Sequence, residues 1–362
     1  MDVTADRPSL TKGADPILSV RNLETTFAVR NSTIKAVRDV SFDLRPGEIL
    51  GVVGESGSGK SATVNSLLRL LPPPPTAVTT GSVVYGGEDL LTVPARRLRA
   101  IRGKEISMIF QDPSTSFNPV QTIGWQIAEA IKVHDRRISR TAVRARVIEL
   151  LTMVGVPSPQ VRFGQFPHEY SGGMRQRAMI AMALANSPKI IIADEPTTAL
   201  DVTIQAQILD LLAKVRTETQ AATILITHDL GIIAEVADRV LVMYAGKIVE
   251  SGQVREVFTD PQHPYTLGLL ASLPRIDTAM EELLSIPGQP PSMSSPPSGC
   301  AFHVRCKLTQ GRDRCRQEQP ALTAAGGSGS HLAACHFSDE MESEAISIAA
   351  IVGTDVRAGT RP

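Results

Sequence analysis

The sequence predicts an α/β fold in which a parallel sheet is wrapped by helices, and three observations lead to it. Continuous apolar runs at 49–54, 106–110, 189–194 and 222–227 are typical of short strands that are buried on both faces. Helical patterns separate these runs, and such alternation indicates parallel strands joined by crossover helices. With 362 residues, 42% of them hydrophobic and 20% charged, the chain is long and apolar enough to bury a large core.

The segments around these runs have other patterns. Residues 17–29 and 35–44 alternate apolar and polar positions, which predicts half-buried antiparallel strands. Between residues 122 and 186 the strand signal disappears, and three helical patterns follow one another. The segment 239–251 predicts a hairpin that turns at Ala245-Gly246.

These patterns divide the chain into parts. We expect a main domain at 16–255 that contains a helical subdomain at about 115–187. After the main domain the composition shifts towards proline, serine and cysteine, which predicts a small Cys-rich C-terminal extension at 256–337. Residues 338–362 are expected to form a loose tail on compositional grounds.

Charge and hydropathy exclude some functions. The chain has 37 basic and 37 acidic residues, so a general electrostatic attraction to nucleic acid or to anionic lipid is not indicated. The first ten residues lack the basic-then-apolar pattern of a signal peptide, and no apolar run approaches the ~20 residues needed to cross a bilayer. We therefore expect a cytosolic protein that reaches a membrane only by docking to another subunit.

Two basic clusters, at 95–104 and "RQR" at 175–177, are expected to be solvated faces or phosphate neighbours. The first has no interleaved aromatic residues that would indicate nucleic-acid binding, and no nucleic-acid partner is predicted. Trp125 and Tyr85 are assigned to packing.

The stretch "GESGSGKS" at Gly54–Ser61 matches the pattern G-x-x-x-x-G-K-[ST] at every fixed position. Glycines let the backbone curl so that its N–H groups point at phosphate oxygens, and the next helix presents its positive end to the same anion. Lys60 would reach the β- and γ-phosphates, and the Ser61 hydroxyl would bind Mg²⁺. The alternative is a glycine turn without a ligand, but the motif and its strand–helix setting predict a nucleoside triphosphate site. The residues expected to form it are Gly54, Glu55, Ser56, Gly57, Ser58, Gly59, Lys60, Ser61 and Ala62.

An acidic pair ends the apolar run "IIIADEP" at 190–196. Asp194 is predicted to bind Mg²⁺, and Glu195 to accept a proton from an attacking water. Adjacent carboxylates repel each other unless a cation lies between them, so a plain surface pair is the less favoured alternative. The expected reaction is hydrolysis of the γ-phosphate.

Four further motifs carry a family resemblance. They are "FQDP" at 110–113, "YSGGMRQR" at 170–177, "TTALD" at 197–201 and "THD" at 227–229. With these motifs in this order, the sequence resembles the ATP-binding subunits of ABC transporters over roughly 16–253. The resemblance implies a phosphate-loop, RecA-like ATPase core with an antiparallel β subdomain and a helical subdomain.

The resemblance also implies roles for single residues. Ser171, Gly172 and Gly173 would form a second anion-binding surface that closes over the ATP of another, homologous ATPase subunit. Asp201 would cross that interface. Two ATP molecules would then be held head to tail between the two subunits.

Three more residues receive roles in the same way. His228 would bond the γ-phosphate and help to hold the water, the alternative being a histidine satisfied at a strand end. Gln111 would touch Mg²⁺ or water and couple the site to a membrane partner. Phe27 stands where the family places an aromatic ring on adenine, although a core phenylalanine is an equal alternative.

One branch of the family fits best. Tyr170 and Met174 depart from the commonest signature, but "FPHEYSGGMRQRAMIAMALA", "IFQDPSTSFNP" and "DPQHPYTLGLLASLP" resemble the dipeptide/oligopeptide importers. That branch implies two transmembrane permease subunits, an extracytoplasmic substrate-binding protein and a peripheral position on the cytoplasmic face of the cell (inner) membrane. The same machinery importing nickel or glutathione is an alternative, as are a soluble non-transport ABC ATPase and a metal-sensing ATPase.

All four cysteines lie near the C-terminus, at Cys300, Cys306, Cys315 and Cys335. A cytosolic chain disfavours disulfides, and the spacing contains no Cys-x-x-Cys pair of the common zinc ribbons. In related subunits a similar array holds a [4Fe–4S] cluster, so this centre is expected, with zinc and inert free cysteines as alternatives. Nearby cations are expected to lower the pKa of the thiols.

Overall fold

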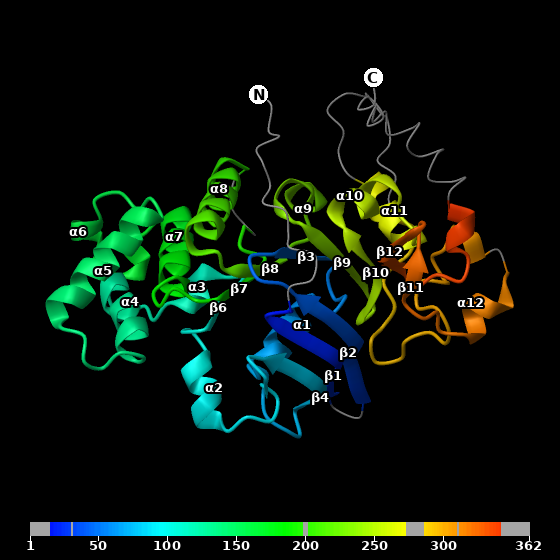
Figure 1. The fold of residues 1–362 in the computed structure, drawn as a ribbon, viewed down its shortest axis with the longest axis horizontal. Helices are drawn as coiled ribbons and strands as arrows, with labels where there is room; N and C mark the ends of the chain where they lie inside the picture. Colours follow the sequence, from blue (N-terminus) through cyan, green and yellow to red (C-terminus); the bar gives the residue numbers. More distant parts are fainter. Residues whose placement is uncertain (1–14, 30–31, 198–201, 273–285, 310, 342–362) are drawn as a thin grey trace, which may run out of the picture.

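Two sheets organise the protein, described by the computed structural model over residues 15–29, 32–197, 202–272, 286–309 and 311–341. Within these residues one sheet has eight strands and is mixed, and the other has four antiparallel strands. Figure 1 shows a group of helices on the left, the four-stranded sheet below and the C-terminal segments on the right.

The eight-stranded sheet contains all four predicted apolar runs. Its strand order is β11-β12-β10-β9-β3-β8-β7-β6, with β9, β3, β8, β7 and β6 parallel. The strands are β3 (Ile49–Val53), β6 (Ile106–Ile109), β7 (Ile190–Asp194), β8 (Ala222–Ile226), β9 (Arg239–Tyr244), β10 (Lys247–Gln253), β11 (Thr323–Ala325) and β12 (Ser328–Ala333). Because parallel strands end at the same edge, the residues that follow β3, β6, β7 and β8 meet there.

The strands are continuously apolar because both faces of this sheet are covered. Along β7, Ile190 and Ile192 join one hydrophobic cluster, and Ile191 and Ala193 join another on the opposite face. The period of two that separates side chains onto opposite faces therefore divides the core into two layers. The predicted parallel sheet is confirmed.

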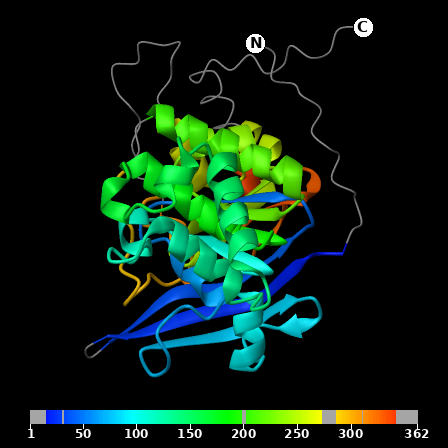
Figure 2. The same ribbon diagram turned by 90° about the vertical axis from the view of Figure 1, so that its left-hand side faces the viewer.

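The four-stranded sheet packs against one of these layers, the one that contains Ile190 and Ile192. Its order is β2-β1-β4-β5, from β1 (Leu18–Val29), β2 (Ser32–Leu44), β4 (Ala77–Tyr85) and β5 (Glu88–Asp89). Residues of α1 (Lys60–Leu67) join its cluster together with strands of both sheets. Figure 2 shows this sheet below the helices of the main body.

Five helices between β6 and β7 form the helical part on the left of Figure 1. They are α3 (Pro113–Ser116), α4 (Ile123–Lys132), α5 (Arg140–Met153), α6 (Pro159–Arg162) and α7 (Gly172–Ala183). Side-chain oxygens of Thr122, Ser139 and Ser171 accept backbone N–H groups at the starts of α4, α5 and α7. These N-caps satisfy donors that a helix leaves unpaired, and so define where each helix begins.

The remaining helices cover the main sheet or lie beyond it. They are α2 (Ala95–Ile101), α8 (Val202–Thr219), α9 (Leu230–Val236), α10 (Val254–Thr259), α11 (Pro264–Ala271) and α12 (Asp313–Gln317). The predicted hairpin is also confirmed, since β9 pairs with β10 and both Ala245 and Gly246 have positive φ. Among the described residues, no helix combines the length and apolar character needed to span a bilayer.

The C-terminal segment extends the main sheet. In β12, Ala333 and Leu332 pair with Glu250 and Ser251 of β10, and β11 pairs with β12. Folded structure continues past the boundary predicted at 337, because Met341 is fully buried against Leu267 and Leu308. Of the predicted tail, 338–341 therefore belong to the folded part, and 342–362 lie outside the described residues.

Candidate functional site

The predicted phosphate loop connects β3 to α1, and its glycines are required by its shape. Gly54 has φ 150°, and a Cβ atom there would lie 2.2 Å from the carbonyl oxygen of Met243. Gly59 has φ 103°, and its Cβ would lie 2.4 Å from the oxygen of Ala36. Neither position accepts a larger residue, so the loop can pass close to its neighbours only with glycine.

Lys60 points back into this loop. Its Nζ donates to the carbonyl oxygens of Gly54 at 2.7 Å and Glu55 at 3.0 Å, and the residue is buried. Burial lowers the pKa of the ammonium, and the carboxylates of Glu195, Asp194 and Glu55 oppose that shift. The Lys60 ammonium therefore lies where it would contact an anion bound inside the loop.

The loop fits an anion in two further respects. The Ser58 hydroxyl is buried and has no hydrogen-bond partner in the described part of the chain. Helix α1 starts at Lys60, so the N–H groups of its first turn have no acceptor inside the helix. A phosphate group would supply acceptors for these donors. Ser56 and Gly57 are exposed at the tip of the loop, and Ala62 is partly buried behind it.

Two of the three predicted Mg²⁺ ligands, Ser61 and Asp194, are neighbours. The Ser61 hydroxyl donates to Oδ1 of Asp194 at 3.0 Å, across 133 residues of sequence. Burial raises the pKa of Asp194; the Ser61 hydrogen bond and Lys60 lower it, while Glu195 raises it further. A hydroxyl beside a buried carboxylate is an oxygen donor set suited to a hard divalent cation.

Three side chains meet beside Asp194, as parallel strand ends predict. Nε2 of Gln111, after β6, donates to Oε2 of Glu195 at 3.0 Å. Nδ1 of His228, after β8, lies 3.6 Å from the same oxygen. Glu195 has a positive φ of 46°, and its N–H donates to the carbonyl of Ile226 at 2.9 Å. The glutamate is thus held in an unusual backbone conformation between the other two side chains.

The signature residues lie elsewhere on the chain. Ser171 and Gly172 are exposed, Gly173 is partly buried, and the Ser171 hydroxyl caps its own helix α7 by accepting from the N–H of Met174. Asp201 lies outside the described residues. The sequence analysis missed Gln176, which is buried in α7 and donates to the carbonyl of Pro196 directly after the acidic pair. Its position inside the "RQR" cluster gave no signal of burial.

Phe27 is only partly buried, on β1 opposite Ile34 and Ala77. It is absent from the buried core within the described residues. Stacking on adenine therefore stays a prediction, while a core role is disfavoured.

The structure brings the four cysteines together. Cys300, Cys306, Cys315 and Cys335 line one cavity of about 20 Å³, and none forms a disulfide. Within the described residues, no group of three or more His, Cys, Asp or Glu side chains is arranged to hold a metal ion. The four thiols thus share a cavity, while the described residues show no metal-binding arrangement around them.

The expectation that nearby cations lower the thiol pKa values was wrong. Burial raises the pKa of Cys300 to about 12 and that of Cys335 to about 11. For Cys315, burial raises the pKa more than the neighbouring Arg312 and Arg314 lower it. Desolvation of the thiolate exceeds the attraction of cations that remain close to solvent.

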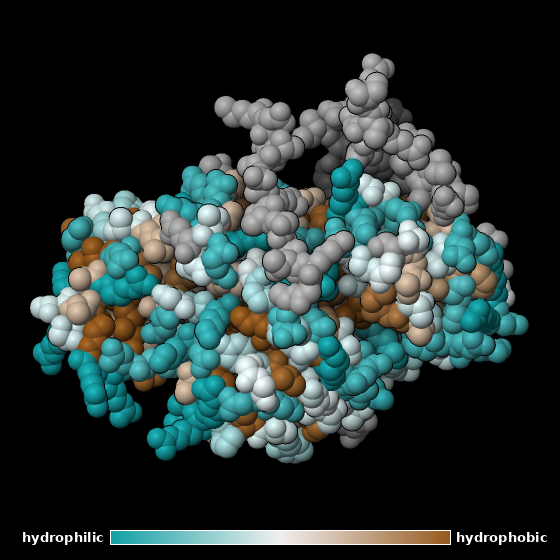
Figure 3. All heavy atoms as spheres, in the orientation of Figure 1, coloured by the Kyte–Doolittle hydropathy of each residue, from teal (hydrophilic) through white to brown (hydrophobic). Residues whose placement is uncertain are grey.

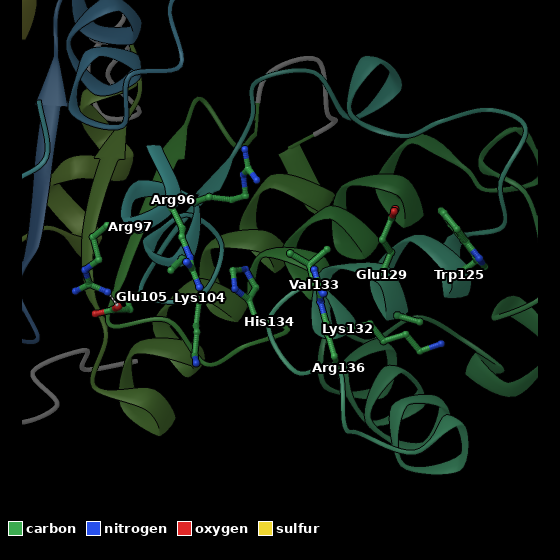
Figure 4. A pocket seen from close by; sticks show the side chains of 13 residues that line it. Arg96, Arg97, Lys104, Glu105, Trp125, Glu129, Lys132, Val133, His134 and Arg136 are labelled. Carbon is green, nitrogen blue, oxygen red and sulfur yellow. Dashed lines mark hydrogen bonds and ion pairs between the residues drawn. The ribbon is translucent and has the colours of Figure 1, made fainter. Parts of the chain in front are cut away.

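A groove lies between α2 and α4 (Figure 4). Its volume is about 870 Å³, and it is lined by Arg96, Arg97, Arg99, Ala100, Lys104, Glu105, Trp125, Ala128, Glu129, Lys132, Val133, His134 and Arg136. Cations outnumber carboxylates on its wall. Trp125 is 47% exposed here, so its assignment to packing was wrong, whereas Tyr85 is buried as predicted. The cations of the basic stretch 95–104 are exposed or half-exposed, as expected of a solvated face, and the stretch forms one wall of this groove.

Family comparisons match two parts of the chain. The family described as "ABC transporter" matches residues 37–198. The family described as "Oligopeptide/dipeptide transporter, C-terminal region" matches residues 249–315. The second match begins in β10 and includes three of the four cysteines.

Curated relatives match most of the chain. The dipeptide transport ATP-binding protein DppD of Bacillus subtilis is 49% identical over 332 residues, which are 92% of this chain and 98% of that protein. The oligopeptide transport ATP-binding protein OppD of the same organism is 52% identical over 290 residues, 80% of this chain and 81% of that protein.

Solved structures show the same fold. The dimeric structure of MJ0796, a bacterial ABC transporter cassette, has a TM-score of 0.59 and 29% identity, and covers 66% of this chain and 99% of that one. A post-hydrolysis MJ0796 dimer bound to ADP and Pi also has a TM-score of 0.59, with 28% identity and the same coverage. The chain therefore belongs to the ABC transporter ATP-binding proteins, in the branch of the dipeptide and oligopeptide transporters.

Proposed function

We propose that this chain hydrolyses ATP to drive the import of dipeptides or oligopeptides. The observation that carries the proposal is the convergence, at one edge of the main sheet, of the Lys60 loop, the Ser61–Asp194 pair and the Glu195 group. The names of the relatives favour peptides over nickel or glutathione as cargo, and favour transport over a soluble or metal-sensing ATPase.

The proposed chemistry assigns one task to each group. Loop N–H groups, the Ser58 hydroxyl and Lys60 would bind the phosphates. Ser61 and Asp194 would hold Mg²⁺, which would supply positive charge at the phosphate oxygens. Glu195 accepts the proton of the attacking water, because its carboxylate lies next to the cation ligands. Support comes from the contact of Lys60 with the loop backbone and from the short side-chain distances of Ser61 to Asp194 and of Gln111 to Glu195.

Two residues would orient this water. Gln111 and His228 both approach Oε2 of Glu195, so water bound there would have donors and acceptors on either side. Because Gln111 begins the connection to the helical part, a shift of that part would change the water site. We propose that this links transport to hydrolysis.

We propose that a second, homologous ATPase subunit completes the site. The start of α7, with Ser171 and Gly172 exposed and Gly173 partly buried, offers an N-terminal surface for the ATP held by that subunit, and Asp201 would lie at the interface. The dimeric structure of MJ0796 supports such pairing by analogy. We propose that this partner is a different chain, so that the two ATPase subunits form a heterodimer.

We further propose two permease subunits and an extracytoplasmic binding protein as partners, with this chain peripheral on the cytoplasmic face of the membrane. The groove between α2 and α4 is the proposed permease contact, since it lies beside the helical part that Gln111 precedes. On the face in Figure 3, hydrophobic groups are interspersed with hydrophilic ones. The basic wall and exposed Trp125 suit an acidic, amphipathic segment of a permease.

Glu195→Gln tests the ATPase proposal. The variant should bind ATP like the parent chain and lose turnover, because glutamine keeps the shape but accepts no proton. Turnover that stays unchanged would remove Glu195 as the base. Purification from detergent-solubilised membranes should bring two permeases with the chain, and a chain that arrives without them would contradict the transport role.

The cysteines are proposed to hold a [4Fe–4S] cluster in the extension at 256–337. Support comes from the common cavity and the absence of disulfides among the four.

Anaerobic purification followed by metal and sulfide analysis tests this centre. Iron, acid-labile sulfide and broad absorption near ~400 nm are expected. If the analysis finds zinc without iron, the centre is a zinc site and not a cluster. If it finds neither metal, the four cysteines are inert free thiols.

A further inference from the structure

A buried ion pair joins the C-terminal extension to the phosphate loop. Nη1 and Nη2 of Arg305 lie 2.7 and 3.0 Å from Oε2 and Oε1 of Glu55. The Arg305 side chain is 4% exposed and that of Glu55 is 26% exposed. Two parallel bonds between guanidinium and carboxylate form the strongest and most directional arrangement of this pair.

Arg305 is itself held in place. Its Nε donates to the carbonyl oxygen of Pro287 at 2.9 Å, and Nη2 donates to that of Ile286 at 3.3 Å. Nη1 also lies 3.4 Å from the hydroxyl of Tyr244. The guanidinium therefore has one orientation, and it presents a fixed positive charge to the loop.

A second contact fixes the backbone at the same residue. The N–H of Glu55 donates to the Tyr265 hydroxyl at 2.7 Å. Tyr265 is fully buried, with its ring centroid 4.6 Å from that of Tyr244 and 5.4 Å from that of Phe302. The start of the phosphate loop is thus held by residues from α11 and the cysteine-bearing segment.

The negative charge of Glu55 lies beside the expected phosphate site, so its pairing with Arg305 affects nucleotide binding. Its carbonyl oxygen accepts from Nζ of Lys60, so the residue is part of the loop that would enclose the phosphates. A carboxylate without a partner at this place would repel a triphosphate, and the repulsion would be strong because the surroundings are partly buried. A fixed cation beside it removes that repulsion.

We propose that Arg305 is a positioning residue for nucleotide binding, which neutralises the Glu55 carboxylate and, together with Tyr265, holds the start of the phosphate loop. The extension thereby contributes to ATP affinity without touching ATP. The inference rests on the proposed function, because it requires that this loop binds the triphosphate.

The test measures ATP and ADP affinity of the full chain by nucleotide titration. Arg305→Met should weaken ATP binding about tenfold, a size typical of coupling through a contact network. The affinity for ADP should fall less than that for ATP, because ADP carries less negative charge. Lys307→Met is the matched control: this exposed cation also adjoins Cys306, and its variant should bind ATP like the parent.

Two more variants separate charge from misfolding. Arg305→Lys keeps the charge but loses the paired bonds, so its affinity should fall between those of the parent and Arg305→Met. In the Arg305→Met background, Glu55→Gln removes the unpaired carboxylate and should restore most of the ATP affinity. A merely structural role for Arg305 predicts no such rescue and equal losses for ATP and ADP.

The two ideas fail in different ways. If the parent chain binds no ATP, the proposed function fails. If the parent binds ATP but Arg305→Met matches Lys307→Met, or Glu55→Gln gives no rescue, the role of Arg305 is overturned while the proposed function stands.

Discussion

The phosphate site and the C-terminal extension are assembled in opposite ways. The loop between β3 and α1 is made by consecutive residues, whose glycines and helix start create the anion site locally. The extension depends on contacts between distant residues, such as Arg305 with Glu55, 250 positions apart, and His331 with Glu250, 81 apart. Local construction can be identified from a motif, whereas long-range construction cannot.

Among the variants that test this comparison, Lys60→Met should have the largest effect, on ATP turnover. It removes the buried ammonium inside the loop, and ATP turnover should fall by about 100-fold or more. Steady-state hydrolysis measures this, with Lys189→Met as an exposed control that should change nothing. The metal content of the extension should stay that of the parent chain. If Lys60→Met also lowered it, the phosphate loop and the extension would not be assembled independently.

Glu250→Leu should have the next largest effect, on stability. Glu250 is fully buried and accepts from the backbone N–H groups of Gln262 and His263 at 2.7 and 3.0 Å, and it lies 2.8 Å from Nε2 of His331. Its loss leaves buried donors unpaired and should lower the free energy of unfolding by about 3 kcal/mol.

Urea unfolding and limited proteolysis would measure this loss. The control is Glu318→Gln, because Glu318 is exposed and its pair with Arg314 should contribute no more than about 0.5 kcal/mol. A Glu250 variant as stable as the control would contradict the role of this network in attaching the extension.

His263 should make the extension sensitive to acid. Burial lowers its pKa to about 3, from 6.5 in the unfolded chain. Since the neutral form is favoured in the folded state, its contribution is present above pH 6.5 and is lost as the pH falls towards 3. At pH 5 the loss should be about 2 kcal/mol. His263→Asn should flatten the pH dependence of unfolding between pH 7 and 5, and an unchanged slope would exclude His263 as its source.

Trp125→Ala should have the smallest effect on the isolated chain. The ring is 47% exposed, so the free energy of unfolding should change by about 0.5 kcal/mol or less. Retention by the permeases should nevertheless weaken, measured by co-purification against Val161→Ala, an exposed residue away from the groove. If the permeases retained both variants equally, the groove would not be the docking surface.

The prediction from sequence succeeded where one pattern had one structural meaning. The apolar runs became the parallel strands, and the ends of β6, β7 and β8 brought Gln111, Glu195 and His228 together. It failed where burial decided the outcome. The exposed Trp125 and the raised thiol pKa values depend on neighbours from other segments, which no local pattern contains.

The sequence by itself determined the parallel sheet, the phosphate loop and its acidic partner, because glycine conformations, strand periodicity and helix starts are properties of neighbouring residues. Only the tertiary structure decided that the four cysteines share a cavity and that Arg305 meets Glu55. These contacts form when segments far apart in the chain pack together, and burial then sets the strength of each charge.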